Sequence, residues 1–158
     1  VGVQAAWNDR YFERQENAAC GRHALNNFLG RPQFLDADLH DLCLDIVTQT
    51  GEDMDDHCLP GGWYSHSVLA MAFATYPQIG CRLEMQASMA ASRDLVLNTE
   101  TFLGALLNLR TRRGVLHWSC LVKVDGLLWH VDSLSFPEQV NSEAAWNAIR
   151  EDAFVSVP

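Results

Sequence analysis

Residues 115–131, VLHWSCLVKVDGLLWHV, hold the strongest structural signal in this sequence of 158 residues. Two apolar runs, residues 115–124 and 127–131, flank the pair Asp125-Gly126. An Asp-Gly pair between two such runs favours a two-residue turn, because both central residues of that turn need positive φ angles. The stretch therefore predicts a β-hairpin in the second half of the chain.

The predicted turn also determines which side chains face one another across the hairpin. Counting back from it pairs Ser119 with Asp132 and His117 with Leu134. Since side chains two apart on a strand share a face, His117, Ser119 and Asp132 lie together, with Asp132 diagonal to His117. An Asp–His hydrogen bond is therefore expected, which favours one tautomer and the protonated ring. Taken singly, the two residues also suit a histidine satisfied within a sheet and a strand-end turn residue. Trp118 points to the other face, where core packing is expected.

Helical patterns occupy the first half of the chain and strand patterns the second. Helices are expected at residues 19–29, 37–47 and 64–76. Asp36 is the candidate cap of the second helix, and residues 48–62 are expected to be a loop. Further strands are expected at residues 81–86, 105–110 and 153–157. We expect the last strand to close an edge of the sheet. The fold class is α+β, with N-terminal helices packed on an antiparallel sheet, in one domain, residues 1–158.

Composition narrows the possible partners. The formal net charge is −9 and the pI about 4.9, whereas a nucleic-acid surface needs clustered Lys and Arg. No apolar run is long enough to span a membrane. The five cysteines are odd in number and include no Cys-x-x-Cys pair, which favours a reduced intracellular setting, cytoplasmic or nuclear, and no metal site. We expect a monomer that binds neither nucleic acid nor membrane.

Cys20 is the candidate nucleophile because it stands where the first predicted helix begins. The partial positive charge of a helix N-terminus favours the thiolate, which is the reactive form of cysteine. A protonated His117 beside it would favour the thiolate further. Gln15, five residues earlier, could donate its amide to a developing oxyanion together with the backbone N–H of Cys20. A buried structural cysteine and a polar loop residue are the alternatives for these two positions.

Two stretches resemble the Josephin family of deubiquitinases. They are FERQENAACGRHALNNFLG, residues 12–30, and LRTRRGVLHWSCLVKVDGLLWHVDS, residues 109–133. The first has Gln-Glu, then Cys, then His three residues later and Leu-Asn-Asn. The second has the His-Trp pair and the acidic residue fifteen positions after the histidine. The segment around Trp63-Tyr64-Ser65 is similar to the family's aromatic segment before a central helix.

The resemblance implies a papain-like fold and a set of roles. Cys20 is then the nucleophile, His117 the general base and acid, Asp132 its orienting partner and Gln15 part of the oxyanion hole. The implied reaction is hydrolysis of ubiquitin isopeptide bonds, or of C-terminal peptide or ester bonds, without a cofactor. The implied partner is ubiquitin, polyubiquitin or a ubiquitin-like modifier. His23 also matches the family, and we interpret it as structural.

One region departs from the family pattern. Family members often have a long helical hairpin after the second helix, whereas residues 48–62 are short and acidic here. We call its four carboxylates the acidic loop: Glu52, Asp53, Asp55 and Asp56. The hypothesis is that the acidic loop recruits a basic face of ubiquitin; a merely solvated loop is the alternative.

Other functions remain open at the level of sequence. Leader-processing cysteine peptidases also place Gln before Cys and use a His followed by Asp, but they usually have Asp-Pro where this chain has Asp132-Ser133. Another papain-like peptidase or an acyl transferase is therefore the alternative enzyme. A non-catalytic ubiquitin-binding module typically lacks one member of the triad, and none is missing here.

Overall fold

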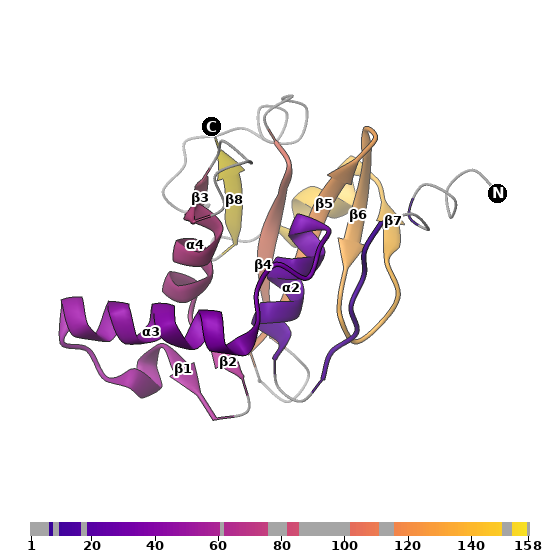
Figure 1. Ribbon diagram of the computed structural model, residues 1–158. Coiled ribbons are helices and arrows are strands. Elements are labelled where there is room, and N and C mark those ends of the chain that lie inside the picture. The colour runs from indigo at the N-terminus through magenta and orange to yellow at the C-terminus, as the bar shows by residue number, and fades with distance from the viewer. Residues whose placement is uncertain are drawn as a thin grey trace.

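The computed structural model describes residues 7, 10–16, 19–60, 62–75, 82–85, 102–110, 116–149 and 153–157. Its helices are Cys20–Leu29 (α2), Asp36–Thr50 (α3), His66–Ala74 (α4) and Ser142–Ala148 (α6), with a 3-10 turn at Met54–Asp56 (η1). Its strands are Cys58–Leu59 (β1), Trp63–Tyr64 (β2), Arg82–Met85 (β3), Gly104–Arg110 (β4), Leu116–Val124 (β5), Leu127–Val131 (β6), Glu138–Val140 (β7) and Phe154–Val157 (β8). Figure 1 shows this arrangement, and the predicted α+β class is confirmed.

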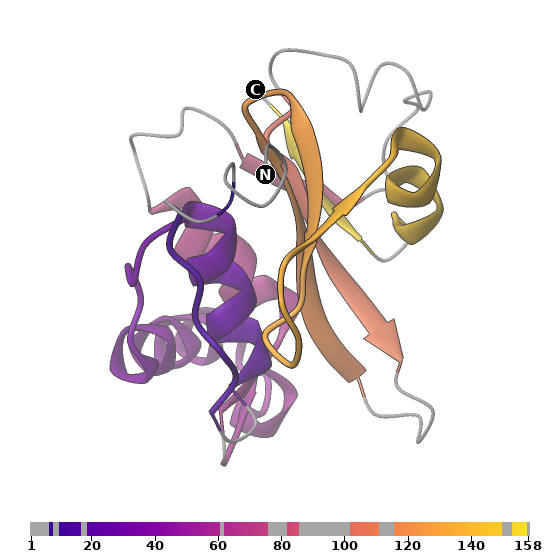
Figure 2. The same ribbon diagram turned by 90° about the vertical axis from the view of Figure 1, so that its right-hand side faces the viewer.

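A six-stranded antiparallel sheet in the order β3-β8-β4-β5-β6-β7 forms the middle layer. The helices α2, α3 and α4 lie on one side of it and α6 on the other (Figure 2). Side chains such as Leu25, Leu69 and Trp118 fill the larger core under the first three helices, and Leu107 and Leu121 belong to the smaller core under α6. Each fully buried leucine contributes roughly 1.5–3 kcal/mol. Within the described residues, no helix is long and apolar enough to cross a membrane.

The predicted hairpin is present with the predicted register. Asp125 and Gly126 have φ angles of 50° and 79°, which are the positive values that the turn requires. Val124 faces Leu127 and the pairing continues to Cys120 and Val131. The strand at the C-terminus was placed wrongly: β8 is not an edge, because it pairs with β3 on one side and with β4 on the other. The edges of the sheet are β3 and β7. The sequence pattern of a strand predicts that the segment is extended, but it does not predict which strands pair with it.

Helix α2 lies against β5 and forms for the reasons that its sequence suggests. Ala24, Leu25 and Phe28 recur at helical spacing and are buried. The helix ends at Gly30, whose φ of 73° is in the left-handed region, and the Gly30 N–H donates to the Asn26 carbonyl at 2.8 Å.

Helix α3 starts where it was expected, but its cap was assigned to the wrong residue. Leu35 is the N-cap, and the Asp38 carboxylate accepts from the Leu35 N–H at 2.8 Å. Asp36 is the first helical residue; its carboxylate instead contacts Arg22 at 3.1 Å and accepts from the Tyr64 hydroxyl at 3.0 Å. The helix also continues to Thr50, beyond the predicted end, and Gly51 terminates it with a φ of 71°.

The segment expected as a loop, residues 48–62, is partly regular. After α3 come η1 and a two-stranded hairpin, β1–β2, in which Cys58 pairs with Tyr64. Helix α4 begins at His66, capped by Ser65, whose side chain accepts from the Val68 N–H. Residue 76 of the predicted third helix and residues 81 and 86 of a predicted strand lie outside the described residues. Neither β7 nor α6 was predicted.

Candidate active site

His117 and Asp132 meet as the hairpin register predicts. The His117 Nε2 and the Asp132 Oδ1 are 2.7 Å apart, and the Leu134 N–H donates to the same carboxylate oxygen at 2.9 Å. His117 is buried and lies on β5, whereas Asp132 follows directly after β6. Ser119 shares this face, as predicted from the register, and its hydroxyl is 3.0 Å from the Nε2 of His130.

Charge and burial set the titration of this pair. The hydrogen bond with Asp132, followed by the hydrogen bond with Cys20, raises the pKa of His117 from 6.5 to about 9, although burial opposes the shift. Burial alone would raise the pKa of Asp132, but the hydrogen bonds from His117 and from the Leu134 N–H bring it below its usual value. The two side chains therefore form an imidazolium–carboxylate pair at neutral pH.

Cys20 is the first residue of α2 and its side chain is buried. Its side chain forms a hydrogen bond with His117, and this contact is one cause of the raised pKa of His117. The first N–H groups of a helix have no acceptor within the helix, and they carry the positive end of its dipole. The Cys20 side chain thus stands at the positive end of a helix and interacts with His117.

Gln15 lies beside the end of β6 through two hydrogen bonds with Ser133. The Gln15 backbone N–H donates to the Ser133 carbonyl at 2.8 Å, and the Ser133 hydroxyl donates to the Gln15 Oε1 at 3.2 Å. Because the hydroxyl is bonded to the amide oxygen, it determines which way the side-chain amide is turned. Ser133 was not predicted as a site residue, because its only signal in the sequence is its position directly after Asp132.

A second network holds the segment that leads to Gln15, residues 11–16, against α2. The Asn27 side chain accepts from the Glu13 N–H at 2.8 Å and donates to the Glu13 carbonyl at 3.1 Å. Asn26 donates to the Glu13 carboxylate at 3.1 Å. His23 is 2.7 Å from that carboxylate through Nδ1, and its Nε2 accepts from the Glu16 N–H at 3.0 Å. This is a structural role for His23, as interpreted from the sequence.

Three hydrogen bonds to the Glu13 carboxylate, from Tyr11, His23 and Asn26, explain its titration. Burial would raise the pKa of the Glu13 carboxyl, but hydrogen bonds from His23, Tyr11 and Asn26 bring it below its usual value. A buried carboxylate with this many donors is rigidly held. In the sequence, Leu25-Asn26-Asn27 indicated only a resemblance to the family. In the structure, the Asn26 and Asn27 side chains hold residues 13–16 in position.

The hairpin β1–β2 lies beside the start of α2. Gly62, between its strands, has a φ of 99°, and a Cβ atom there would be 3.1 Å from the Cβ of Ala19. The Trp118 Nε1 donates to the Tyr64 carbonyl at 3.1 Å, so β2 is also bound to the strand that carries His117. Trp118 is buried in the core, as expected.

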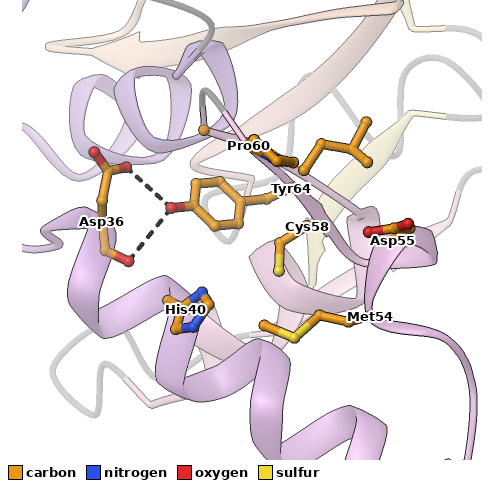
Figure 3. A pocket seen from close by; sticks show the side chains of 9 residues that line it. Asp36, His40, Met54, Asp55, Cys58, Pro60 and Tyr64 are labelled. Atoms are coloured by element: carbon orange, nitrogen blue, oxygen red, sulfur yellow. Dashed lines mark hydrogen bonds between the residues drawn. The ribbon is translucent and has the colours of Figure 1, made fainter.

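A cavity of about 510 Å³ opens between this hairpin and α3 (Figure 3). Its lining residues are Asp36, His40, Met54, Asp55, Cys58, Leu59, Pro60, Gly62 and Tyr64. None of the candidate site residues lines it, so the cavity is a separate feature; its lining residues Gly62 and Tyr64 contact Ala19 and Trp118, which are the sequence neighbours of Cys20 and His117. Of the acidic loop, Asp55 lines the cavity, and Glu52 lies 3.4 Å from the Nε2 of His57.

The structure thus brings Cys20, His117 and Asp132 together and places Gln15 beside them through Ser133. Within the described residues, no three His, Cys, Asp or Glu side chains gather as metal ligands. A family model described as Josephin matches residues 15–151, a range that includes all four candidate residues. None of the curated proteins compared with the chain matches it.

Proposed function

The chain belongs to the Josephin family, which is of the papain-like deubiquitinase type, and we propose that it hydrolyses isopeptide bonds at the C-terminus of ubiquitin. The observation that carries the proposal is the His117–Asp132 bond at 2.7 Å, together with the coupling of His117 to Cys20. The geometry supports thiol-dependent acyl transfer to water. Ubiquitin as the substrate rests on the family.

In the proposed first step, the Cys20 thiolate attacks the carbonyl carbon of the isopeptide bond. The carbonyl oxygen becomes an oxyanion, and the Cys20 N–H together with the Gln15 amide would stabilise it. With its Nε2–H donated to Asp132, the His117 ring exchanges protons through Nδ1. His117 then protonates the departing lysine amine, the C–N bond breaks, and ubiquitin remains on Cys20 as a thioester.

In the second step a water molecule replaces the amine. His117, now neutral, takes a proton from this water as it attacks the thioester carbonyl. The tetrahedral intermediate collapses, the C–S bond breaks, and ubiquitin leaves with a free C-terminal carboxyl group, which releases its proton to solvent. The thiolate–imidazolium pair is restored. No cofactor enters either step.

A ubiquitin carrying a C-terminal electrophile tests the proposal. The wild-type chain should form a covalent adduct, Cys20→Ala should form none, and His117→Ala should lose orders of magnitude in labelling rate. Asp41→Asn, on the exposed part of α3, is the matched control and should label like the wild type. Binding of ubiquitin without any adduct would instead identify a non-catalytic module. Cleavage of other peptides with no reaction toward ubiquitin would identify a different papain-like peptidase.

A further inference from the structure

Two cysteines outside the candidate site lie in contact. Cys43 is on α3 and Cys58 on β1, and their Sγ atoms are 2.7 Å apart. Both thiols are free. They are 15 positions apart in the chain, so the contact joins the two ends of the segment that contains the acidic loop and η1. Nothing in the proposed hydrolysis uses either thiol.

The two thiols differ in their access to solvent. Cys43 is fully buried, whereas Cys58 is 8% exposed and lines the cavity between the hairpin and α3 (Figure 3). A small oxidant in the cavity therefore reaches Cys58 first. Burial, followed by the hydrogen bond with Cys58, raises the pKa of Cys43 to about 12, which agrees with a second and not a first role for this thiol.

We propose that Cys43 and Cys58 form an oxidisable pair, in which a peroxide converts the two thiols into a disulfide that fixes the β1–β2 hairpin to α3. The Cys58 sulfur attacks the peroxide and the O–O bond breaks. Cys58 becomes a sulfenic acid, and one water molecule is released. The Cys43 sulfur then displaces the sulfenic hydroxyl, which takes up the Cys43 proton and leaves as a second water. Two electrons pass from the two sulfurs to the peroxide.

The disulfide acts on the part of the fold that borders Cys20. The hairpin contacts Ala19 through Gly62 and is bonded to Trp118 through Tyr64. Since the thiols already touch, the bond leaves the folded arrangement in place and mainly restricts the unfolded chain. Closing a loop of about 15 residues raises the ratio of folded to unfolded protein by roughly 100-fold. Reduction reverses the bond.

The experiment uses Cys20→Ser, which removes the candidate nucleophile as a competing target of peroxide. The sequence between Arg31 and Arg82 contains no Lys or Arg, so trypsin leaves both thiols in one peptide and cleavage at aspartate is needed. After treatment with hydrogen peroxide, we expect peptides containing Cys43 and Cys58 to be cross-linked, with a mass lower by two hydrogen atoms. We also expect a raised unfolding midpoint. Dithiothreitol should return the peptide mass and the unfolding midpoint to the values of the untreated protein.

The controls separate this pair from general oxidation. Cys58→Ser should lose the cross-link and the stabilisation, while Cys120→Ser, at another buried thiol, should keep both. If Cys58 accumulates as sulfinic acid while Cys43 stays reduced, the proposal is overturned. It is overturned equally if the cross-link forms without any gain in the unfolding midpoint. Because labelling by the ubiquitin probe needs neither thiol, these outcomes are independent of the proposed function.

Discussion

Asp132→Asn is expected to lower the pKa of His117 while leaving the imidazole in place. The asparagine oxygen can still accept the Nε2–H of His117, but the negative charge is gone. The pKa of His117 rises from 6.5 to about 9 in the folded protein. At 1.36 kcal/mol for each unit, this rise corresponds to a preference of about 3 kcal/mol for the protonated ring. The hydrogen bond with Asp132 is the largest cause of the raised pKa of His117. In Asp132→Asn this pKa should therefore be lower by roughly 1–2 pH units.

The pH dependence of kcat/KM on a fluorogenic ubiquitin amide measures this change. Acylation requires a protonated His117, so the wild-type rate should fall as the pH rises through about 9. In Asp132→Asn the same alkaline decline should occur roughly 1–2 pH units lower. Asp41→Asn should leave the pH profile of the wild type unchanged.

Stability gives an independent readout of the same pKa. A group whose pKa is higher in the folded state stabilises the protein fully below its unfolded pKa and loses that contribution as the pH rises. For His117 the loss falls between pH 6.5 and about 9. The free energy of unfolding of the wild type, measured in urea, should therefore fall as the pH rises across this window. In Asp132→Asn it should fall less steeply with pH. A uniform loss of activity with an unmoved alkaline decline would refute the electrostatic role and leave Asp132 with orientation alone.

Three further changes test the site and its support. Gly104→Ala should destabilise by about 3 kcal/mol in urea unfolding, because the new Cβ would lie 2.1 Å from the Leu121 carbonyl oxygen; Gly51→Ala, with open space but a φ of 71°, should cost only about 1 kcal/mol. Ser133→Ala should lower kcat about tenfold at unchanged KM, and it should have no further effect in a Gln15→Ala background, where kcat has already fallen about 100-fold. Independent, additive losses would contradict a role through the amide. If the acidic loop recruits a basic face of ubiquitin, neutralising its four carboxylates should raise KM at low salt only. An unchanged salt dependence of KM would contradict this recruitment.

The His117–Asp132 pair could be predicted because every step of the inference is local. Asp125-Gly126 fixes the turn, the turn fixes the register, and the register puts Asp132 diagonal to His117. A one-residue slip would have turned the buried Trp118 outward, so the core enforces the same answer. Cys20 could be predicted at a helix start from the apolar spacing that follows it.

Other features depend on partners that lie far away in sequence. The strand β8 has neighbours on both sides, but its own residues specify only an extended, half-apolar run. Asp36 follows the usual preference for an acidic cap, yet its carboxylate contacts Arg22 and Tyr64, from two other elements. The β1–β2 hairpin has two-residue strands, too short for any periodicity. In each case tertiary contacts decided what the local pattern left open.

Hydrogen bonds fix the position of Gln15, the candidate oxyanion donor, relative to the residues of the triad. Ser133 follows Asp132 in the chain, and its backbone carbonyl and hydroxyl both bond to Gln15. On the other side, the segment with Gln15 is fixed to α2 through Glu13 and Asn27, and α2 begins with Cys20. The end of β6 and helix α2 are therefore connected through the segment that carries Gln15. A change that moves Asp132 should displace Gln15 as well, so losses in orientation and in oxyanion binding should be coupled and not additive.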